Sequence, residues 1–405
     1  LKAMYGEKQA PKLWSDMLHK ILLQLGFDRC PFSACLYYYS NGASVVFLTV
    51  HVDDGLLFVS HEHLFEQFIT KIQEHLPKVS LTRPLQKYVG IEVAYDRSAQ
   101  RVELSQKLFS EELLSDANRQ EDIPMCPSYN LRTEPPNPLN DSLLHITGKL
   151  RYLCDRTRHD LLLATGEISK GGAESPSDLH VRTAMKTLRF AKVTAGRALA
   201  LGSSTPPKLF AFTDASYHGD GNSKSRLGGC LFLSPHCGAF NCFSKSSTLV
   251  TQSSTHAELL ALYETVNLVV HCRQILDFIK HPQLEATRIY CDSQPSIQLC
   301  SLLKMTHKTS SINMRVHYIR QCLNSRLISL HFIPTALNIA DVLTKPLPAE
   351  LFDAHSSKLQ QGFQDTDLEE YTQHTNLVLD SLKCDGTMCL CCYNSSSLFI
   401  PHMQD

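Results

Sequence analysis

Apolar residues recur along the first part of the chain in two patterns. Over residues 12–27 and 63–76 they return every three or four positions, which predicts two amphipathic helices. Residues 44–50 and 56–59, in contrast, are short continuous apolar runs that flank an Asp-Asp-Gly turn, which predicts a hairpin of buried strands. Residues 88–93 and 101–104 predict a second hairpin, and a short helix is expected over 109–117.

A polar stretch with five prolines, residues 118–140, interrupts this pattern and predicts a linker. Helical spacing returns over 143–156, 160–169 and 178–193. This region is the most basic of the chain. Its lysines and arginines can form an ordinary solvated helix face or a surface that follows a phosphate backbone.

From residue 208 the pattern predicts alternating strands and helices. We expect strands at 208–214, 227–233, 239–244, 288–291 and 328–332, and helices at 255–279, 294–303, 312–323 and from 337. Three strands, a helix, a strand, two helices, a strand and a last helix describe an α/β fold, with helices packed on the faces of a sheet.

Composition limits the interpretation in three ways. A chain of 405 residues can form two or three domains with sizeable cores. A net charge of −1 gives a nucleic-acid partner no overall support, so such contacts need local basic patches. The fifteen cysteines lack the spacing of a disulfide framework and no apolar run could span a membrane, so we expect reduced thiols and an intracellular protein. Because the chain begins at Leu1 inside a motif, we expect it to be part of a longer polyprotein.

Four acidic residues lie at the ends or starts of predicted elements in the second half of the chain. Asp214 ends the first strand, Glu258 opens the long helix, Asp292 ends the fourth strand and Asp341 opens the last helix. Each alone can be a turn or cap residue. Functional residues of such sheets gather at one edge, however, and converging carboxylates are best neutralised by a pair of Mg²⁺ ions. A site of that kind hydrolyses phosphodiesters.

The pair Asp53-Asp54 in the first hairpin has two readings. Asp-Gly is a favoured turn pair, and the acids then have only a structural role. Alternatively, two adjacent carboxylates held by buried strands relieve their repulsion by binding a divalent cation.

Four phrases resemble the C-terminal part of the Pol polyprotein of copia-type LTR retrotransposons. They are Tyr5-Gly6-Glu7-Lys8-Gln9-Ala10-Pro11, His51-Val52-Asp53-Asp54, Ser253-Ser254-Thr255-His256-Ala257-Glu258, and Ile339-Ala340-Asp341-Val342-Leu343-Thr344-Lys345-Pro346-Leu347. They are similar to the family's YGLKQAP, YVDD, SSTEAE and IADIFTKPL. The likeness covers residues 1 to about 347.

The resemblance implies a partial reverse-transcriptase palm and thumb at 1–120, a linker and helical connection at 121–205, and a ribonuclease H-like mixed sheet flanked by helices at 206–347. Residues 348–405 match nothing in the family and are expected to be a disordered tail. Asp214, Glu258, Asp292 and Asp341 fall on the nuclease's metal-binding acids. The implied cofactor is two Mg²⁺ ions, with Mn²⁺ as an alternative. The implied reaction is hydrolysis of the RNA strand of an RNA–DNA hybrid.

Departures from the family pattern limit the polymerase expectation. The family's third catalytic aspartate would precede Leu1, so we expect Asp53 and Asp54 alone not to support DNA synthesis. His51 stands where the family has Tyr, and Glu7 where it has Leu. His256 replaces a Glu that is not a metal ligand, so the nuclease site should tolerate it.

Further expectations concern partners. Template RNA, its cDNA, and other Pol segments (the integrase and the N-terminal part of the reverse transcriptase) are the implied partners, in a cytoplasmic particle or the nucleus, and no membrane is involved. Gln9, Arg226, Lys245 and His307 are candidates for nucleic-acid contact, although each can instead be an ordinary structural or surface residue. Cys384, Cys389, Cys391 and Cys392 suggest zinc but lack two Cys-x-x-Cys pairs.

Two other functions compete with a nuclease. One is a non-catalytic nucleic-acid-binding remnant of such an element. The other is a transposase or integrase on the same fold. Those enzymes end their acidic set on Glu, whereas this set ends on Asp341.

Overall fold

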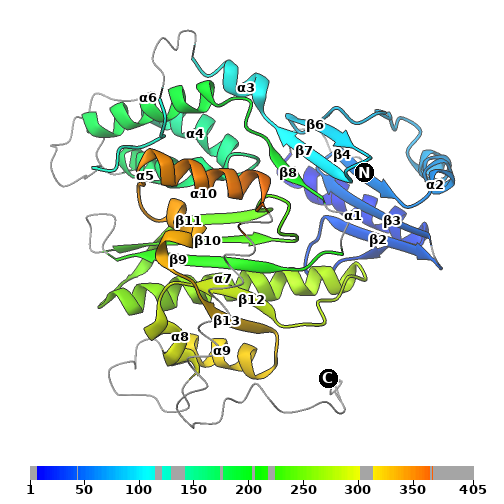
Figure 1. The fold of residues 1–405 in the computed structure, drawn as a ribbon. Helices are drawn as coiled ribbons and strands as arrows, with labels where there is room; N and C mark the ends of the chain where they lie inside the picture. Colours follow the sequence, from blue (N-terminus) through cyan, green and yellow to red (C-terminus); the bar gives the residue numbers. More distant parts are fainter. Residues whose placement is uncertain are drawn as a thin grey trace.

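A computed structural model describes residues 7–42, 44–114, 121–128, 142–173, 177–202, 206–217, 224–301, 313–364 and 367. His307, most of the predicted linker and the four cysteines from Cys384 to Cys392 lie outside these residues. The described chain forms three sheets and their covering helices (Figure 1).

The N-terminal sheet has the order β1-β2-β3-β4 and is antiparallel throughout. Its strands are β1 (Asp28–Arg29), β2 (Leu36–Asn41), β3 (Ser44–His51) and β4 (Asp54–Val59), and its helices are α1 (Ala10–Gln24) and α2 (Glu62–His75). Leu22 of α1, Val46 of β3 and Phe68 of α2 meet in one core. The predicted hairpin is therefore present, but β1 and β2 were not predicted from the sequence.

The second sheet joins segments that are about a hundred residues apart. It consists of β5 (Lys87–Tyr88), β6 (Ile91–Asp96), β7 (Arg101–Ser105) and β8 (Leu199–Leu201) in that order, and α3 (Lys107–Glu111) follows β7. Leu104 of β7 pairs with Leu199 of β8. The end of the helical connection thus completes a sheet that begins in the N-terminal part.

The helical connection contains α4 (Ser142–Cys154), the 3₁₀ helix η2 (His159–Leu161), α5 (Leu162–Ala173) and α6 (Asp178–Val193). The start of α6 is fixed by the residue before it, because the Ser177 backbone N–H donates to His180 Nδ1 at 3.1 Å. Both the position and the length of α6 agree with the sequence pattern.

The largest sheet has the order β11-β10-β9-β12-β13. Its strands are β9 (Phe210–Ser216), β10 (Lys224–Phe232), β11 (Asn241–Val250), β12 (Thr287–Cys291) and β13 (Ile328–Phe332). The first three strands are antiparallel, and β12 lies parallel to both β9 and β13. The remaining elements are α7 (Ser254–Phe278), α8 (Gln294–Ser301), α9 (Asn313–Asn324), η4 (Thr335–Leu337), η5 (Ile339–Leu343) and α10 (Ala349–Gln361). The predicted mixed sheet flanked by helices is confirmed.

Alternate residues of the central strands face two different cores, as the period of a strand requires. Ala211 and Ile289 pack in a core with residues of α7 and α9. Phe212 and Tyr290 point to the other face, into a core that also holds residues of α4, α5 and α6. The connection and the large sheet therefore share one hydrophobic core, although the sequence suggests a boundary at 205/206.

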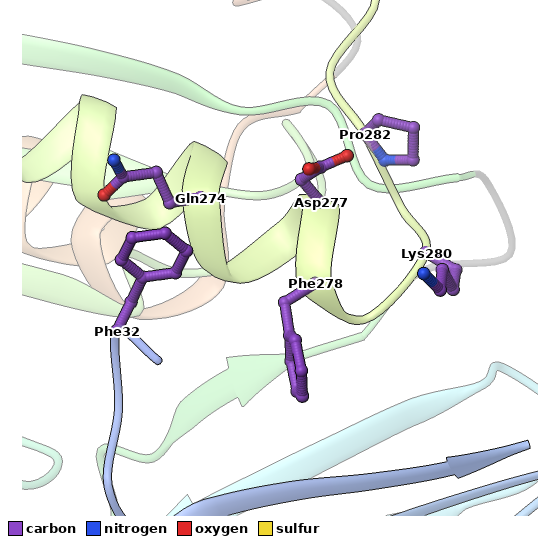
Figure 2. A pocket seen from close by; sticks show the side chains of 6 residues that line it. All are labelled: Phe32, Gln274, Asp277, Phe278, Lys280 and Pro282. Carbon is purple, nitrogen blue, oxygen red and sulfur yellow. The ribbon is translucent and has the colours of Figure 1, made fainter. Parts of the chain in front are cut away.

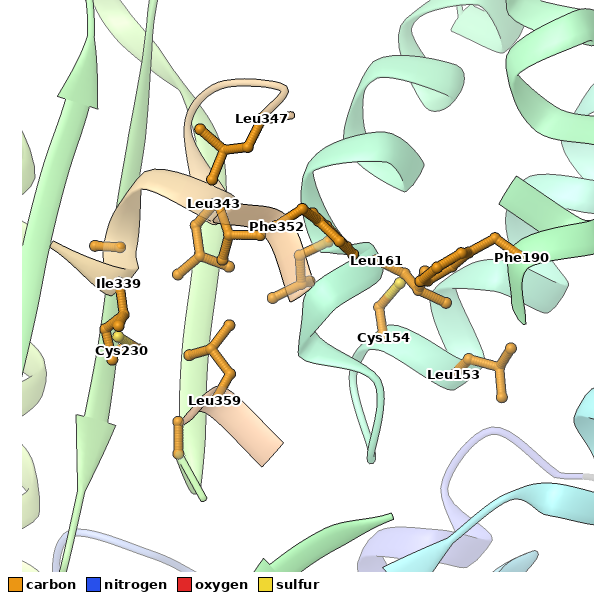
Figure 3. Packing of buried hydrophobic residues seen from close by; sticks show 14 of the residues in the cluster. Leu153, Cys154, Leu161, Phe190, Cys230, Ile339, Leu343, Leu347, Phe352 and Leu359 are labelled. Carbon is orange, nitrogen blue, oxygen red and sulfur yellow. The ribbon is translucent and has the colours of Figure 1, made fainter. Parts of the chain in front are cut away.

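Helix α10 corrects the expectation that everything after residue 347 is an unassigned tail. Phe352 and Leu359 are buried in the same core as Leu161 and Phe190 (Figure 3), and the Phe352 and Phe190 rings meet edge to face at 5.6 Å. Phe363 lies just after the helix and stacks on Phe212 at 5.8 Å. The folded chain thus extends through at least residue 364. No helix within the described ranges is long and apolar enough to cross a bilayer.

Candidate metal centre

Four acidic side chains approach one another at one end of the large sheet. Asp214 lies in β9, Asp292 directly follows the adjacent strand β12, Asp341 lies in η5, and Glu258 lies in the second turn of α7. Carboxylate oxygens of Asp214, Asp292 and Asp341 lie within 4.8 Å of one another. Oxygens of Asp292 and Glu258 and the sulfur of Cys291 form a second group within the same distance. Asp292 therefore belongs to both groups and connects them.

The parallel pairing of β9 with β12 explains why Asp214 and Asp292 meet. Thr213 lies opposite Cys291 in the register, so both strands deliver their next residue to the same edge. Asp214 itself is 1% exposed. The Thr335 hydroxyl donates to Asp292 Oδ2 at 2.7 Å and so orients the second carboxylate.

Two structural features position Asp341: the cap of η5 and a glycine in β10. The Asn338 side chain caps η5 by accepting from the Ala340 N–H at 3.2 Å, and its amide nitrogen donates to the Thr213 carbonyl at 3.0 Å. Gly228 of β10, which lies opposite Asp214, leaves room for η5. A Cβ at this glycine would lie 2.6 Å from Thr344 Cγ2 and 2.9 Å from Leu343 Cβ. Because glycine has no side chain, η5 can approach β10 closely at this position.

The N-terminus of α7 places Glu258. The Ser253 hydroxyl accepts from the His256 N–H at 3.1 Å, and His256 Nδ1 accepts from the Gln252 N–H at 3.3 Å. The reciprocal bond of a capping box comes from the N-cap N–H, whereas His256 here accepts from the residue before the N-cap and ties down the chain that enters α7. One turn further, Glu258 Oε1 accepts from the Ala215 N–H at 3.3 Å, next to Asp214.

The cluster carries more negative charge than its surroundings balance. Burial, together with the carboxylates of Asp214 and Asp292, raises the pKa of Glu258 well above its usual value. Burial and the Asp214 charge raise the pKa of Asp341 to about 8. Burial also raises the pKa of Asp214, against the opposing effect of Lys345. In the protein alone, Asp214, Glu258 and Asp341 are therefore driven toward protonation.

Two residues beside Asp341 in the last motif complete the site, although the sequence pattern gave them no role. The Thr344 hydroxyl donates to Asp214 Oδ2. Lys345 Nζ lies 3.0 Å from Asp341 Oδ2 and 3.9 Å from Asp214 Oδ2. The sequence could have identified both residues as part of the site, because they follow Asp341 by three and four positions and so lie within one helical turn of that acid.

The donor set fits a hard divalent cation. Glu258 Oε2 and Asp341 Oδ1 are both buried and have no hydrogen-bond partner among the described residues. Such oxygens are costly to bury unless a cation binds them, and carboxylate oxygens are the ligands that Mg²⁺ prefers. Burial and the neighbouring Glu258 raise the pKa of the Cys291 thiol, so this sulfur stays protonated and is a poor ligand.

Asp53 and Asp54 occupy a different environment. Both are exposed in the tight turn between β3 and β4, and His51 pairs with Asp54 across it. Trp14 of α1 supports this turn by donating its indole N–H to the Val52 carbonyl at 2.8 Å. Within the described ranges, these two acids join no third potential metal ligand.

Of the four residues predicted to contact nucleic acid, the three that the structure describes differ in how exposed they are. Gln9 is exposed directly before α1, and Lys245 is exposed on β11, where its ammonium pairs with Glu264 at 2.8 Å. Both remain predictions. The prediction for Arg226 is wrong, because this side chain is 3% exposed and forms a buried ion pair with Glu167 of α5. Its guanidinium holds the connection against the sheet and is not available to a phosphate backbone. His307 lies outside the described residues.

A pocket that is distinct from the acidic cluster lies at the C-terminal end of α7. It measures about 530 Å³ and is lined by Phe32 of the N-terminal part and by residues at the C-terminal end of α7 and just beyond it, among them Asp277, Phe278 and Lys280 (Figure 2). None of the predicted site residues lines it. Its position gives it no part in the chemistry of the acidic cluster.

Comparisons with known proteins support the resemblance. Residues 1–127 match the family model described as reverse transcriptase (RNA-dependent DNA polymerase). The chain is 27% identical over 368 residues to the retrovirus-related Pol polyprotein from transposon TNT 1-94 of Nicotiana tabacum, covering 87% of this chain and 27% of the relative. It is 28% identical over 368 residues to the corresponding polyprotein from transposon RE1 of Arabidopsis thaliana, covering 88% of this chain and 24% of the relative.

The chain therefore spans about a quarter of the length of these relatives. Among solved structures, the foamy viral protease-reverse transcriptase in complex with dsDNA is similar with 14% identity and a TM-score of 0.46, over 82% of this chain and 60% of that one. The relatives' match runs through most of this chain, whereas the family model ends at residue 127. The resemblance to Pol polyproteins of copia-type retrotransposons is thereby confirmed, and the first 127 residues match the reverse transcriptase family model.

Proposed function

We propose that the acidic cluster is the active site of a metal-dependent nuclease that hydrolyses the RNA strand of RNA–DNA hybrids. The observation that carries the proposal is the approach of Asp214, Glu258, Asp292 and Asp341 at one edge of the sheet. Two of their buried carboxylate oxygens have no hydrogen-bond partner in the part of the chain that the structure describes. The similarity to retrotransposon Pol polyproteins supports the choice of a nucleic-acid substrate.

The four acids would hold a pair of Mg²⁺ or Mn²⁺ ions. In two-metal sites, the bound ions supply an activated water molecule and stabilise the leaving oxygen of an in-line displacement. Asp292 is common to both groups of candidate ligands, so its carboxylate would help to hold either ion. The protein's own contribution is a rigid donor set, because Asp214 and Asp292 come from neighbouring strands and Glu258 from a capped helix.

Asp53 and Asp54 are proposed as two ligands of a separate metal site in the reverse transcriptase domain. Their turn between two strands of the N-terminal sheet is a rigid support for such a site. A third carboxylate for it would have to come from outside the described residues.

Cleavage of an end-labelled RNA–DNA hybrid in Mg²⁺ by the wild-type chain and Asp292→Asn tests the nuclease. We expect the wild-type protein to shorten the RNA strand and leave the DNA strand intact. Losing an outer-shell partner of a metal ligand commonly costs 10- to 100-fold, so the loss of a shared ligand should cost at least about 100-fold. The matched control is Asp155→Asn, which removes a carboxylate from an exposed ion pair with Arg151.

Equal cleavage by the wild-type protein and Asp292→Asn would reject the assignment. Binding of the hybrid without cleavage by any variant would favour the non-catalytic remnant instead. A second measurement needs no substrate. Asp341→Asn should melt at a higher temperature than the wild-type protein in EDTA at pH 8, because it removes one of the mutually repelling charges.

A further inference from the structure

The two sides of the acidic cluster differ in charge balance, and this inference rests on the proposed metal site. Lys345 lies beside Asp214 and Asp341, with its ammonium 3.0 Å from Asp341 Oδ2 and 3.9 Å from Asp214 Oδ2. The Oδ2 atoms of Asp341 and Asp214 therefore already have a cation, whereas Asp341 Oδ1 is buried without a hydrogen-bond partner among the described residues. On the other side, Glu258 Oε2 is buried and has no partner among the described residues.

The Lys345 ammonium lies beside two carboxylates that could also bind a metal ion. An ammonium so close to two carboxylates gains from both, and a divalent ion bound between the same oxygens would lie within a few ångströms of it. Two positive charges at that separation repel strongly in a partly buried site. The Lys345 side chain is 35% exposed and has a flexible four-carbon stem, so it can move outward into solvent.

We propose that Lys345 is a built-in counter-cation that competes for the metal position between Asp214 and Asp341. One divalent ion then binds tightly on the side of Glu258 and Asp292. A second ion binds more weakly, because it must displace the ammonium of Lys345. The residue thereby sets the metal concentration at which the site becomes fully loaded.

Calorimetric titration of the full chain with Mn²⁺ alone tests this proposal. Every protein in this titration, including the one called wild type, carries Asp53→Asn and Asp54→Asn, so that the separate site proposed there adds no binding event. The wild-type protein should show two binding events whose affinities differ at least about tenfold. In Lys345→Met and Lys345→Gln the weaker event should tighten by at least about tenfold, because the competing charge is gone. Lys345→Arg keeps the charge and should retain the two unequal events. The matched control is Lys208→Met, which removes an exposed lysine paired with Glu285 at 2.8 Å, and it should titrate like the wild-type protein.

A second measurement follows the wild-type side chain directly and needs no substitution. Labelling of Lys345 by an amine-reactive reagent, quantified by mass spectrometry, should rise several-fold as the second ion binds and stay constant as the first one does. Labelling of Lys208 should remain constant throughout.

Unchanged Mn²⁺ affinities in Lys345→Met and Lys345→Gln would overturn the proposal, as would two equal binding events in the wild-type protein or constant labelling of Lys345. If neither the wild-type protein nor the variants bind Mn²⁺, both this proposal and the proposed function fail. If the titrations follow the expectation and the hybrid stays uncut, the nuclease assignment fails and the role of Lys345 stands.

Discussion

Arg226 of β10 and Glu167 of α5 form an ion pair that is buried between the large sheet and the helical connection. Glu167 also accepts from Lys170 Nζ at 2.8 Å. Gly166 permits the approach, because a Cβ there would lie 3.0 Å from the Arg226 guanidinium. Arg226 lies opposite Ser216 in the register, two residues beyond Asp214, so this pair fixes the connection close to the metal centre.

Breaking this pair should destabilise the protein strongly. Arg226→Met leaves the buried Glu167 carboxylate with Lys170 as its remaining cationic partner. Because the guanidinium that Glu167 meets in the interior is gone, the free energy of unfolding should fall by up to about 3–5 kcal/mol. The double variant Arg226→Met/Glu167→Met should recover much of that loss. Urea denaturation measures both. Arg151→Met, which disrupts an exposed pair, should cost less than about 1 kcal/mol. Similar losses for Arg226→Met and Arg151→Met would contradict the structural role.

Gly228→Ala should disturb the metal centre without changing any charge. The added methyl group would meet Thr344 and Leu343 at less than 3 Å and push η5 away from β10. Such overpacking costs about 1–3 kcal/mol, and Mn²⁺ binding should weaken with it. Gly148→Ala is the control, because nothing lies within 4 Å of its added Cβ and alanine favours a helix. Wild-type melting and Mn²⁺ affinity in Gly228→Ala would show that η5 does not need this close approach.

His355 should make the protein sensitive to acid. Burial, with smaller effects of Lys358 and Lys345, lowers its pKa from 6.5 to about 4. The unfolded chain therefore binds a proton between those values that the folded chain does not. The stability from neutral His355 is complete above pH 6.5 and is lost as pH falls toward 4. His355→Leu removes this loss, so the stability difference between variant and wild type should shift by about 2–3 kcal/mol from pH 7 to pH 4.

Guanidinium denaturation at several pH values measures that difference, and acids common to both proteins cancel in it. Substituting the exposed His271 by Gln serves as the control. A pH-independent difference between His355→Leu and the wild-type protein would show that folding does not lower the pKa of His355.

Helix α10 should be required for a stable core. Phe352 is 4% exposed and packs against Phe190, so Phe352→Ala should cost about 3–5 kcal/mol. A chain that ends at residue 347 should lose more, since Leu359 and Phe363 leave the same core. Glu350→Ala, on the exposed side of the first turn, should have little effect. Thermal melting compares the variants, and a wild-type melting temperature for the chain ending at 347 would contradict this role.

The spacing of apolar residues predicts those helices and strands whose formation depends on residues close by in the sequence. The helix over 178–193 has the predicted bounds because its apolar spacing and its Ser177–His180 cap lie within a few residues of one another. The strand at 328–332 was likewise predicted in full. β8 has only three residues and exists because it pairs with β7, about a hundred residues earlier. No local pattern can report such a pairing.

The sequence by itself determined which acids could form a site, because Asp214, Glu258, Asp292 and Asp341 lie at strand ends or helix starts that short-range patterns reveal. It could not decide which charged residues would stay on the surface. Arg226 was a candidate for nucleic-acid contact, and only the packing of α5 on β10 gave it Glu167 as a buried partner. Lys345 lies one helical turn after Asp341, and only the packing of η5 on β9 also placed its ammonium near Asp214. The physical reason is that the desolvation of a charge depends on what the fold brings against it, and those contacts come from residues far away in the chain.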